Sequence, residues 1–70
     1  MNNLTKMRIV AYKGGVPVGY VKSVSYKNGT FTLTQDKMFA KTYSKQEKIM
    51  SDIDTIAYQG QQKGFVFLIG

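Results

Sequence analysis

The sequence predicts an α+β domain in which an antiparallel sheet of three to four strands, in the order β-β-β-α-β, carries one amphipathic helix on one face. Segments with alternating apolar and polar residues, separated by glycine turns, fill the first half of the chain, and a helical apolar stripe follows them. A sheet and a helix that each have one apolar side bury those sides against each other, which gives two layers. Seventy residues make a single domain, residues 1–70.

Three strands are expected before the helix, over residues 7–12, 18–26 and 30–34. Two hairpin turns separate them, because Gly14-Gly15 and Asn28-Gly29 supply the positive φ that tight turns require. The uncharged face of the first strand is expected to point into the core; it consists of Met7, Ile9 and Ala11. Pro17 cannot donate to a strand ladder, so it belongs at a strand start or on an edge.

An elbow over residues 35–43 is expected to connect the third strand to the helix. Asp36 can cap a single helical turn over residues 37–39. Met38, Phe39 and Tyr43 are expected to fill the gap between sheet and helix.

The helix is expected over residues 45–57. Ser44 and Glu47 have the spacing of a capping box, in which serine and glutamate side chains bond each other's backbone amides. The apolar stripe is expected to comprise Ile49, Met50, Ile53, Ile56 and Ala57. The opposite, polar side is expected to comprise Lys45, Lys48, Ser51, Asp52 and Thr55.

Residues 58–64 are rich in glycine and glutamine and are expected to form a loop. Residues 65–69, with the sequence FVFLI, are apolar on both faces, which is typical of a central strand. The last strand is therefore expected inside the sheet, beside the first strand.

The residue inventory argues against an enzyme, a metal site or a cofactor site. The chain has no His, Cys or Trp, which removes the commonest general base, metal ligand and thiol nucleophile. Of the four acidic residues, Asp36 and Glu47 are expected to cap helices. Asp52 and Asp54 lie two residues apart on the helix, so their side chains point in different directions.

The formal charge of +6 is concentrated in the predicted sheet. Residues 1–46 hold eight basic residues and one acidic residue, whereas residues 47–70 hold two basic and three acidic residues. Such asymmetry favours a polyanionic or acidic partner, although a small soluble domain often carries a net charge of about 2 to 8 in magnitude.

Tyrosines alternate with lysines along the first two strands and their turns, and these residues are the candidate binding site. A basic and aromatic sheet face can stack on bases, and tyrosine is also enriched in protein interfaces. The alternative is that the tyrosines pack in the core and the lysines are solvated. The candidates are Tyr12, Lys13, Tyr20, Lys22, Tyr26 and Lys27.

A series of short motifs resembles a group of small uncharacterised proteins carried by phages and prophages of Gram-positive bacteria. The motifs are Tyr20-Val21-Lys22-Ser23, Asn28-Gly29, Thr34-Gln35-Asp36, Ala40-Lys41-Thr42-Tyr43-Ser44 and Glu47. The chain departs from that pattern in being more basic and in ending with an unusually apolar strand. The resemblance implies a ββ(β)αβ fold and an accessory role, often binding and inhibiting or redirecting one host factor.

The sequence thus predicts a non-enzymatic module that binds a host or phage protein, alone or as a homodimer joined through an edge strand. The alternative is a nucleic-acid-binding protein that uses the lysine- and tyrosine-rich hairpin. No apolar run reaches the ~18 residues of a membrane span, and the start of the sequence, residues 1–8, lacks the apolar run of a signal peptide. A cytoplasmic location is expected, with the first residues frayed.

Overall fold

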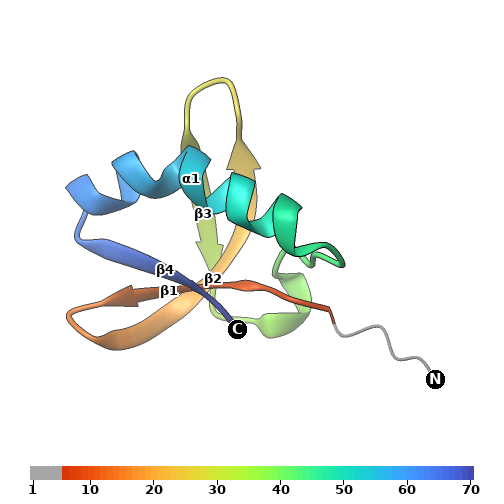
Figure 1. The fold of residues 1–70 in the computed structure, drawn as a ribbon. Helices are drawn as coiled ribbons and strands as arrows, with labels where there is room; N and C mark the ends of the chain where they lie inside the picture. Colours follow the sequence, from red (N-terminus) through yellow and green to blue (C-terminus); the bar gives the residue numbers. More distant parts are fainter. Residues whose placement is uncertain (1–5) are drawn as a thin grey trace.

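The computed structural model describes residues 6–70 and has the predicted α+β architecture (Figure 1). Residues 1–5, for which fraying was expected, lie outside the described residues. The elements in order are β1 (Ile9–Lys13), β2 (Val16–Ser25), β3 (Thr30–Thr34), the short 3-10 helix η1 (Lys37–Phe39), α1 (Gln46–Gln62) and β4 (Phe65–Ile69).

The four strands form one antiparallel sheet in the order β3-β2-β1-β4. Both predicted hairpin turns are present, with positive φ at Gly14, Gly15 and Gly29. Pro17 lies at the start of β2, as expected, where a bulge shifts the register against β1 between Ala11 and Tyr12.

The last strand pairs with β1, as expected, but it forms an edge of the sheet instead of its centre. The apolar residues on both faces of β4 therefore do not result from a central position in the sheet. Phe67 packs into the core, while Val66 and Leu68 on the opposite face are 59% and 51% exposed. Within residues 6–70, no segment covers these two apolar side chains on the outer face of β4.

The helix begins at Gln46 and has no side-chain capping bond at its N-cap, Lys45, so the predicted capping box is wrong. Tyr43 exchanges two backbone hydrogen bonds of 2.8 Å with Met7, which holds the chain extended up to the helix. The predicted loop over residues 58–64 is also wrong in part. The helix continues to Gln62 and ends before Gly64, which has the positive φ typical of a residue just beyond a helix.

The core lies between α1 and the inner face of the sheet. The expected core face of β1 is confirmed, with Ile9 and Ala11 fully buried and Met7 packed against them. The other buried core residues are Val21, Tyr43, Ile49, Ile56 and Phe67. Phe31 on β3 meets Phe67 on β4 edge to face, with ring centroids 5.0 Å apart. Side chains of the two edge strands therefore meet in the core beneath the helix.

The apolar stripe of α1 is predicted correctly for its isoleucines and wrongly for three other positions. Ile49 and Ile56 are fully buried, and Ile53 packs against the core. Met50 is 45% exposed and Ala57 is exposed, whereas Asp52, expected on the polar side, is fully buried. The buried stripe is thus rotated toward Asp52 and Gly60, because the helix contacts both β3 and β4.

In the elbow, the predicted cap at Asp36 is confirmed, but only one of the three residues expected to fill the gap between sheet and helix is buried. The Asp36 carboxylate accepts a hydrogen bond of 2.9 Å from the Met38 amide at the start of η1. Tyr43 is buried, but Met38 and Phe39 are 88% and 64% exposed. Met38 and Phe39 belong to η1, none of whose residues is buried, and the buried residues of the elbow are Ala40 and Tyr43.

None of the helices within residues 6–70 combines the length and the apolar character that crossing a membrane requires.

Candidate functional site

The face of the sheet opposite α1 carries two adjacent rows of uncharged side chains. Cross-strand pairing places Tyr20, Val10 and Leu68 side by side in one row. The same pairing places Pro17, Tyr12 and Val66 in the next row, nearer the β1–β2 turn. Antiparallel sheets with one solvated face usually carry polar residues there, so an apolar solvated face is informative. We call these six residues the outer-face patch.

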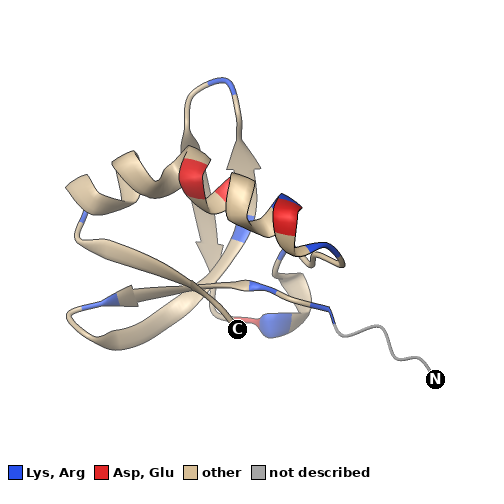
Figure 2. Cartoon of the chain, viewed as in Figure 1, with Lys and Arg blue, Asp and Glu red and all other residues tan. Residues whose placement is uncertain are grey.

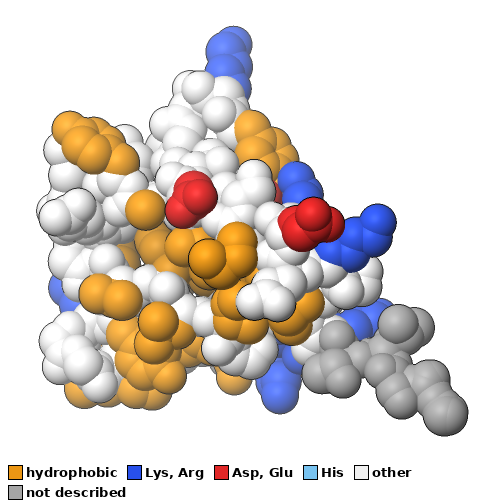
Figure 3. All heavy atoms as spheres, in the orientation of Figure 1, with side chains coloured by type: hydrophobic (Ala, Val, Ile, Leu, Met, Phe, Trp, Pro, Cys, Tyr) orange, Lys and Arg blue, Asp and Glu red, His pale blue; other side chains and the backbone are white. Residues whose placement is uncertain are grey.

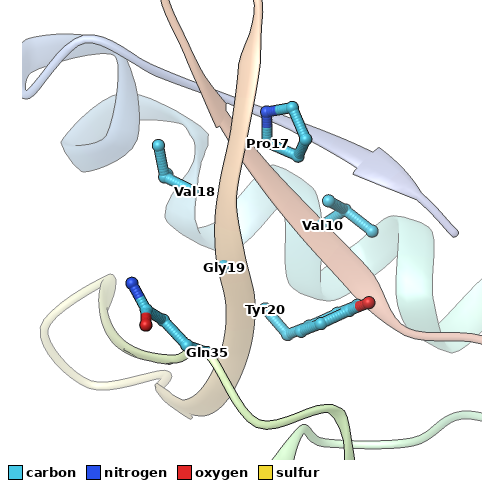
Figure 4. Close-up of a pocket in the computed structure, with 6 residues that line it drawn as sticks. All are labelled: Val10, Pro17, Val18, Gly19, Tyr20 and Gln35. Carbon is cyan, nitrogen blue, oxygen red and sulfur yellow. The ribbon is translucent and has the colours of Figure 1, made fainter.

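A hollow of about 290 Å³ opens beside Tyr20 in this patch. Its lining includes Val10 and Pro17 of the patch together with Gln35 (Figure 4). Gly19 forms its floor, where an added Cβ would lie 2.9 Å from the backbone oxygen of Thr34. A larger residue at position 19 would therefore collide with the backbone of β3.

The structure brings together only two of the six predicted binding residues. Tyr12 and Tyr20 both belong to the outer-face patch. Lys13 instead lies over the ring of Phe65, with its Nζ 5.3 Å from the ring centroid. Lys22 is exposed at a bulge in β2, and Lys27 is exposed in the β2–β3 turn. Figure 2 shows the basic residues spread over turns and several sides of the molecule.

The sixth predicted residue, Tyr26, belongs to a different site, a cluster around the buried carboxylate of Asp52. Its hydroxyl donates to Asp52 Oδ2 over 3.0 Å, and Lys41 Nζ donates to the same oxygen over 3.1 Å. Tyr43 donates a third, short hydrogen bond to that oxygen. Lys48 Nζ lies 3.4 Å from the other oxygen, Oδ1, which accepts no hydrogen bond. We call these five residues the Asp52 cluster.

The ionisation of the Asp52 cluster follows from this geometry. Burial alone would raise the pKa of Asp52, but hydrogen bonds from Tyr43, Lys41 and Tyr26 outweigh it and hold that pKa below its usual value. Burial would lower the pKa of Lys41, but its bonds to Tyr26 and Asp52 raise it overall. Burial and the bond to Asp52 both raise the pKa of Tyr43. At neutral pH the cluster thus holds an anionic Asp52 and a cationic Lys41.

These charge states fit a cluster that stabilises the fold better than one that performs acid–base catalysis, because catalysis needs a pKa near the working pH. The cluster joins the end of β2 through Tyr26, the elbow through Lys41 and Tyr43, and the helix through Asp52. Lys41 Nζ also lies 5.2 Å from the centroid of the Tyr26 ring. Within residues 6–70, no group of three or more His, Cys, Asp or Glu side chains could hold a metal ion.

A second hollow, of about 240 Å³, lies beside the cluster where the elbow enters the helix. Three lysines border it, Lys41, Lys45 and Lys48, together with the hydroxyl-bearing Thr42 and Ser44. This hollow therefore has a basic border within residues 6–70.

The sequence pattern did not predict the Asp52 cluster or the part of the patch formed by Val66 and Leu68. At about 100° per residue, Asp52 lies only about 40° from Ile56 on the helix, so the helical period already placed it beside the apolar stripe. Its three donors come from two other segments, the end of β2 and the elbow, which no local pattern on the helix reveals. Comparison of the chain with protein-family models, with curated proteins and with solved structures finds no match.

Proposed function

We propose that this chain is a non-enzymatic binding module that docks on a partner protein through the outer-face patch. One observation carries the proposal: six uncharged residues from three strands form a continuous surface on the side of the sheet that α1 does not cover. Uncovered apolar surface of this kind is typical of protein interaction sites.

The composition of the patch also fits a protein partner. Tyr12 and Tyr20 offer large rigid rings, which concentrate binding energy at protein interfaces. The hollow beside Tyr20 offers space for a side chain of the partner. The short motifs that resemble small phage and prophage proteins favour a host or phage protein as the partner, and inhibition of that protein as the proposed consequence.

The test is capture from a bacterial lysate with the tagged chain, before and after nuclease treatment. Tyr20→Ser is the test variant, and Tyr58→Ser is the matched control because Tyr58 is 70% exposed on α1. We expect the wild type and the control to retain a stoichiometric protein after nuclease treatment, and the Tyr20→Ser chain to lose it. Equal capture by all three chains contradicts the proposal.

The second candidate is a nucleic-acid-binding protein, favoured by the +6 charge and by the hollow bordered by Lys41, Lys45 and Lys48. It predicts an affinity that falls steeply with salt as phosphate contacts release counterions. Lys45→Gln is the informative variant, because Lys45 lies outside the Asp52 cluster and its loss leaves that cluster intact. A titration at low salt that shows no binding removes this candidate.

A further inference from the structure

We infer that β4 pairs with β4 of a second copy of this chain, so that the two sheets join into one across a two-fold axis at Phe67. This inference goes beyond the proposed function and does not rest on it. It rests on the backbone register of β4, on its sequence and on the surface beside it.

The register identifies which backbone groups of β4 are free. Arg8 and Gly70 exchange both backbone hydrogen bonds, over 3.0 and 2.8 Å. Such pairs alternate along an antiparallel ladder, so Leu68 and Val66 also direct their N–H and C=O groups toward β1. The groups of Phe65, Phe67 and Ile69 then point to the other side, where β4 has no neighbouring strand.

An antiparallel copy centred on Phe67 satisfies these groups in full. Phe67 exchanges two hydrogen bonds with its own copy, and Phe65 exchanges two with Ile69 of the copy at each end. The side chains match as well, because an aromatic residue opposes an aromatic one and an aliphatic residue opposes an aliphatic or aromatic one. A two-fold interface requires such self-complementarity, which the sequence FVFLI provides.

The edge lacks the features that keep edge strands apart. Natural edges are protected by charged residues, by proline, by bulges or by a covering element. The strand Phe65–Ile69 has no charged residue, no proline and no bulge against β1. An apolar groove of about 410 Å³ runs along it, bordered on α1 by Met50 and Ile53. Figure 3 shows hydrophobic side chains gathered below α1 in this view, with charged side chains mainly around them.

Charge favours this edge as the place where two copies meet. Each chain carries +6, so two copies repel each other at long range. Lys13 lies over Phe65, and in the proposed dimer the two Phe65 residues are four residues, or about 13 Å, apart along the paired strands. This separation exceeds the Debye length of about 8 Å at physiological salt. The other edge strand, β3, has the sequence TFTLT and is less suited to apolar self-pairing.

Single-cysteine variants test the register, because the natural chain has no cysteine. In the proposed dimer Val66 opposes Leu68 of the copy as a non-hydrogen-bonded pair, with Cα atoms about 4.5 Å apart, within the range of disulfides. Each residue lies roughly 7 to 8 Å from its own copy, which is too far for a disulfide. We expect Val66→Cys mixed with Leu68→Cys to form a disulfide-linked dimer on mild oxidation. Neither variant alone should do so.

Sedimentation equilibrium of the unmodified chain provides the second arm. We expect twice the monomer mass of 7.9 kDa for the wild type and for Thr32→Lys, a control on the other edge strand. Ile69→Lys should sediment as a monomer with an unchanged circular dichroism spectrum. A wild type that stays monomeric up to about 1 mM, where dimerisation would contribute less than about 4 kcal/mol, overturns the inference. Equal cross-linking of each cysteine variant alone overturns the register.

Discussion

Asp52→Asn is the change that tests the interior of this fold most sharply. The side chain is fully buried, and its Oδ2 accepts from Tyr26, Lys41 and Tyr43. A hydrogen bond to a charged group contributes about 1.5 to 3 kcal/mol and one to a neutral group about 0.5 to 1.5 kcal/mol. Loss of the charge therefore costs about 1 kcal/mol for each bond. Lys41 is 30% exposed, so solvent screening reduces its share and the expected total is about 2 to 3 kcal/mol.

The assay is thermal unfolding followed by circular dichroism. For a domain of this size, 1 kcal/mol corresponds to about 4 to 8 °C, so the expected decrease in Tm is roughly 10 to 20 °C. Asp54→Asn is the matched control, because Asp54 is exposed on the same helix and its loss should change stability by less than about 0.5 kcal/mol. Equal melting temperatures for the two variants would refute the assignment of Asp52 to a buried cluster.

Three further changes follow from the same packing. The lowered pKa of Asp52 means that its contribution is fully present above its unfolded value of 3.8 and is lost as pH falls through the folded pKa. Urea titrations below pH 4 should therefore show a steeper loss of stability for Asp54→Asn than for Asp52→Asn, and parallel curves would contradict this. Gly60→Ala should destabilise the chain by about 1 to 3 kcal/mol, because its Cβ would lie 2.2 Å from Phe67 Cε2. If the higher helix propensity of alanine outweighed the clash with Phe67, the free energy of unfolding would rise by about 1 kcal/mol instead. Ile56→Asp should unfold the chain whereas Ala57→Asp should fold, as judged by circular dichroism, and the reverse order would mean that the helix is rotated.

The sequence was sufficient for the features that depend on neighbouring residues. The alternation of Phe31 and Leu33, the glycine turns and the Asp36 cap are local, and the structure contains all of them. Local sequence patterns gave a wrong prediction where contact with a distant segment determines which residue a position requires. Gly60 is typical of a loop, but it lies inside α1 because the Phe67 ring packs directly against it.

The candidate site was only partly predictable for the same reason. Tyr12 and Tyr20 share the outer face through alternation, which a sequence pattern reveals. Their neighbours Val66 and Leu68 are more than forty positions away in the sequence and join them only because β4 pairs with β1. Alternation along β2 predicts that Tyr26 shares a face with Tyr20. The bulge at Lys22 reverses that alternation, so Tyr26 turns toward Asp52 instead.

Cysteine footprinting of the bound module tests the role of the outer-face patch most directly. The chains Pro17→Cys and Tyr58→Cys each carry one thiol, the first at an exposed position of the outer-face patch and the second on α1. Both keep Tyr20, so both should bind the captured protein. Maleimide should label both thiols in the free chains. With the captured protein bound, the thiol at position 17 should be protected while the thiol at position 58 still reacts. Unchanged labelling at position 17 in the complex would contradict docking through this face.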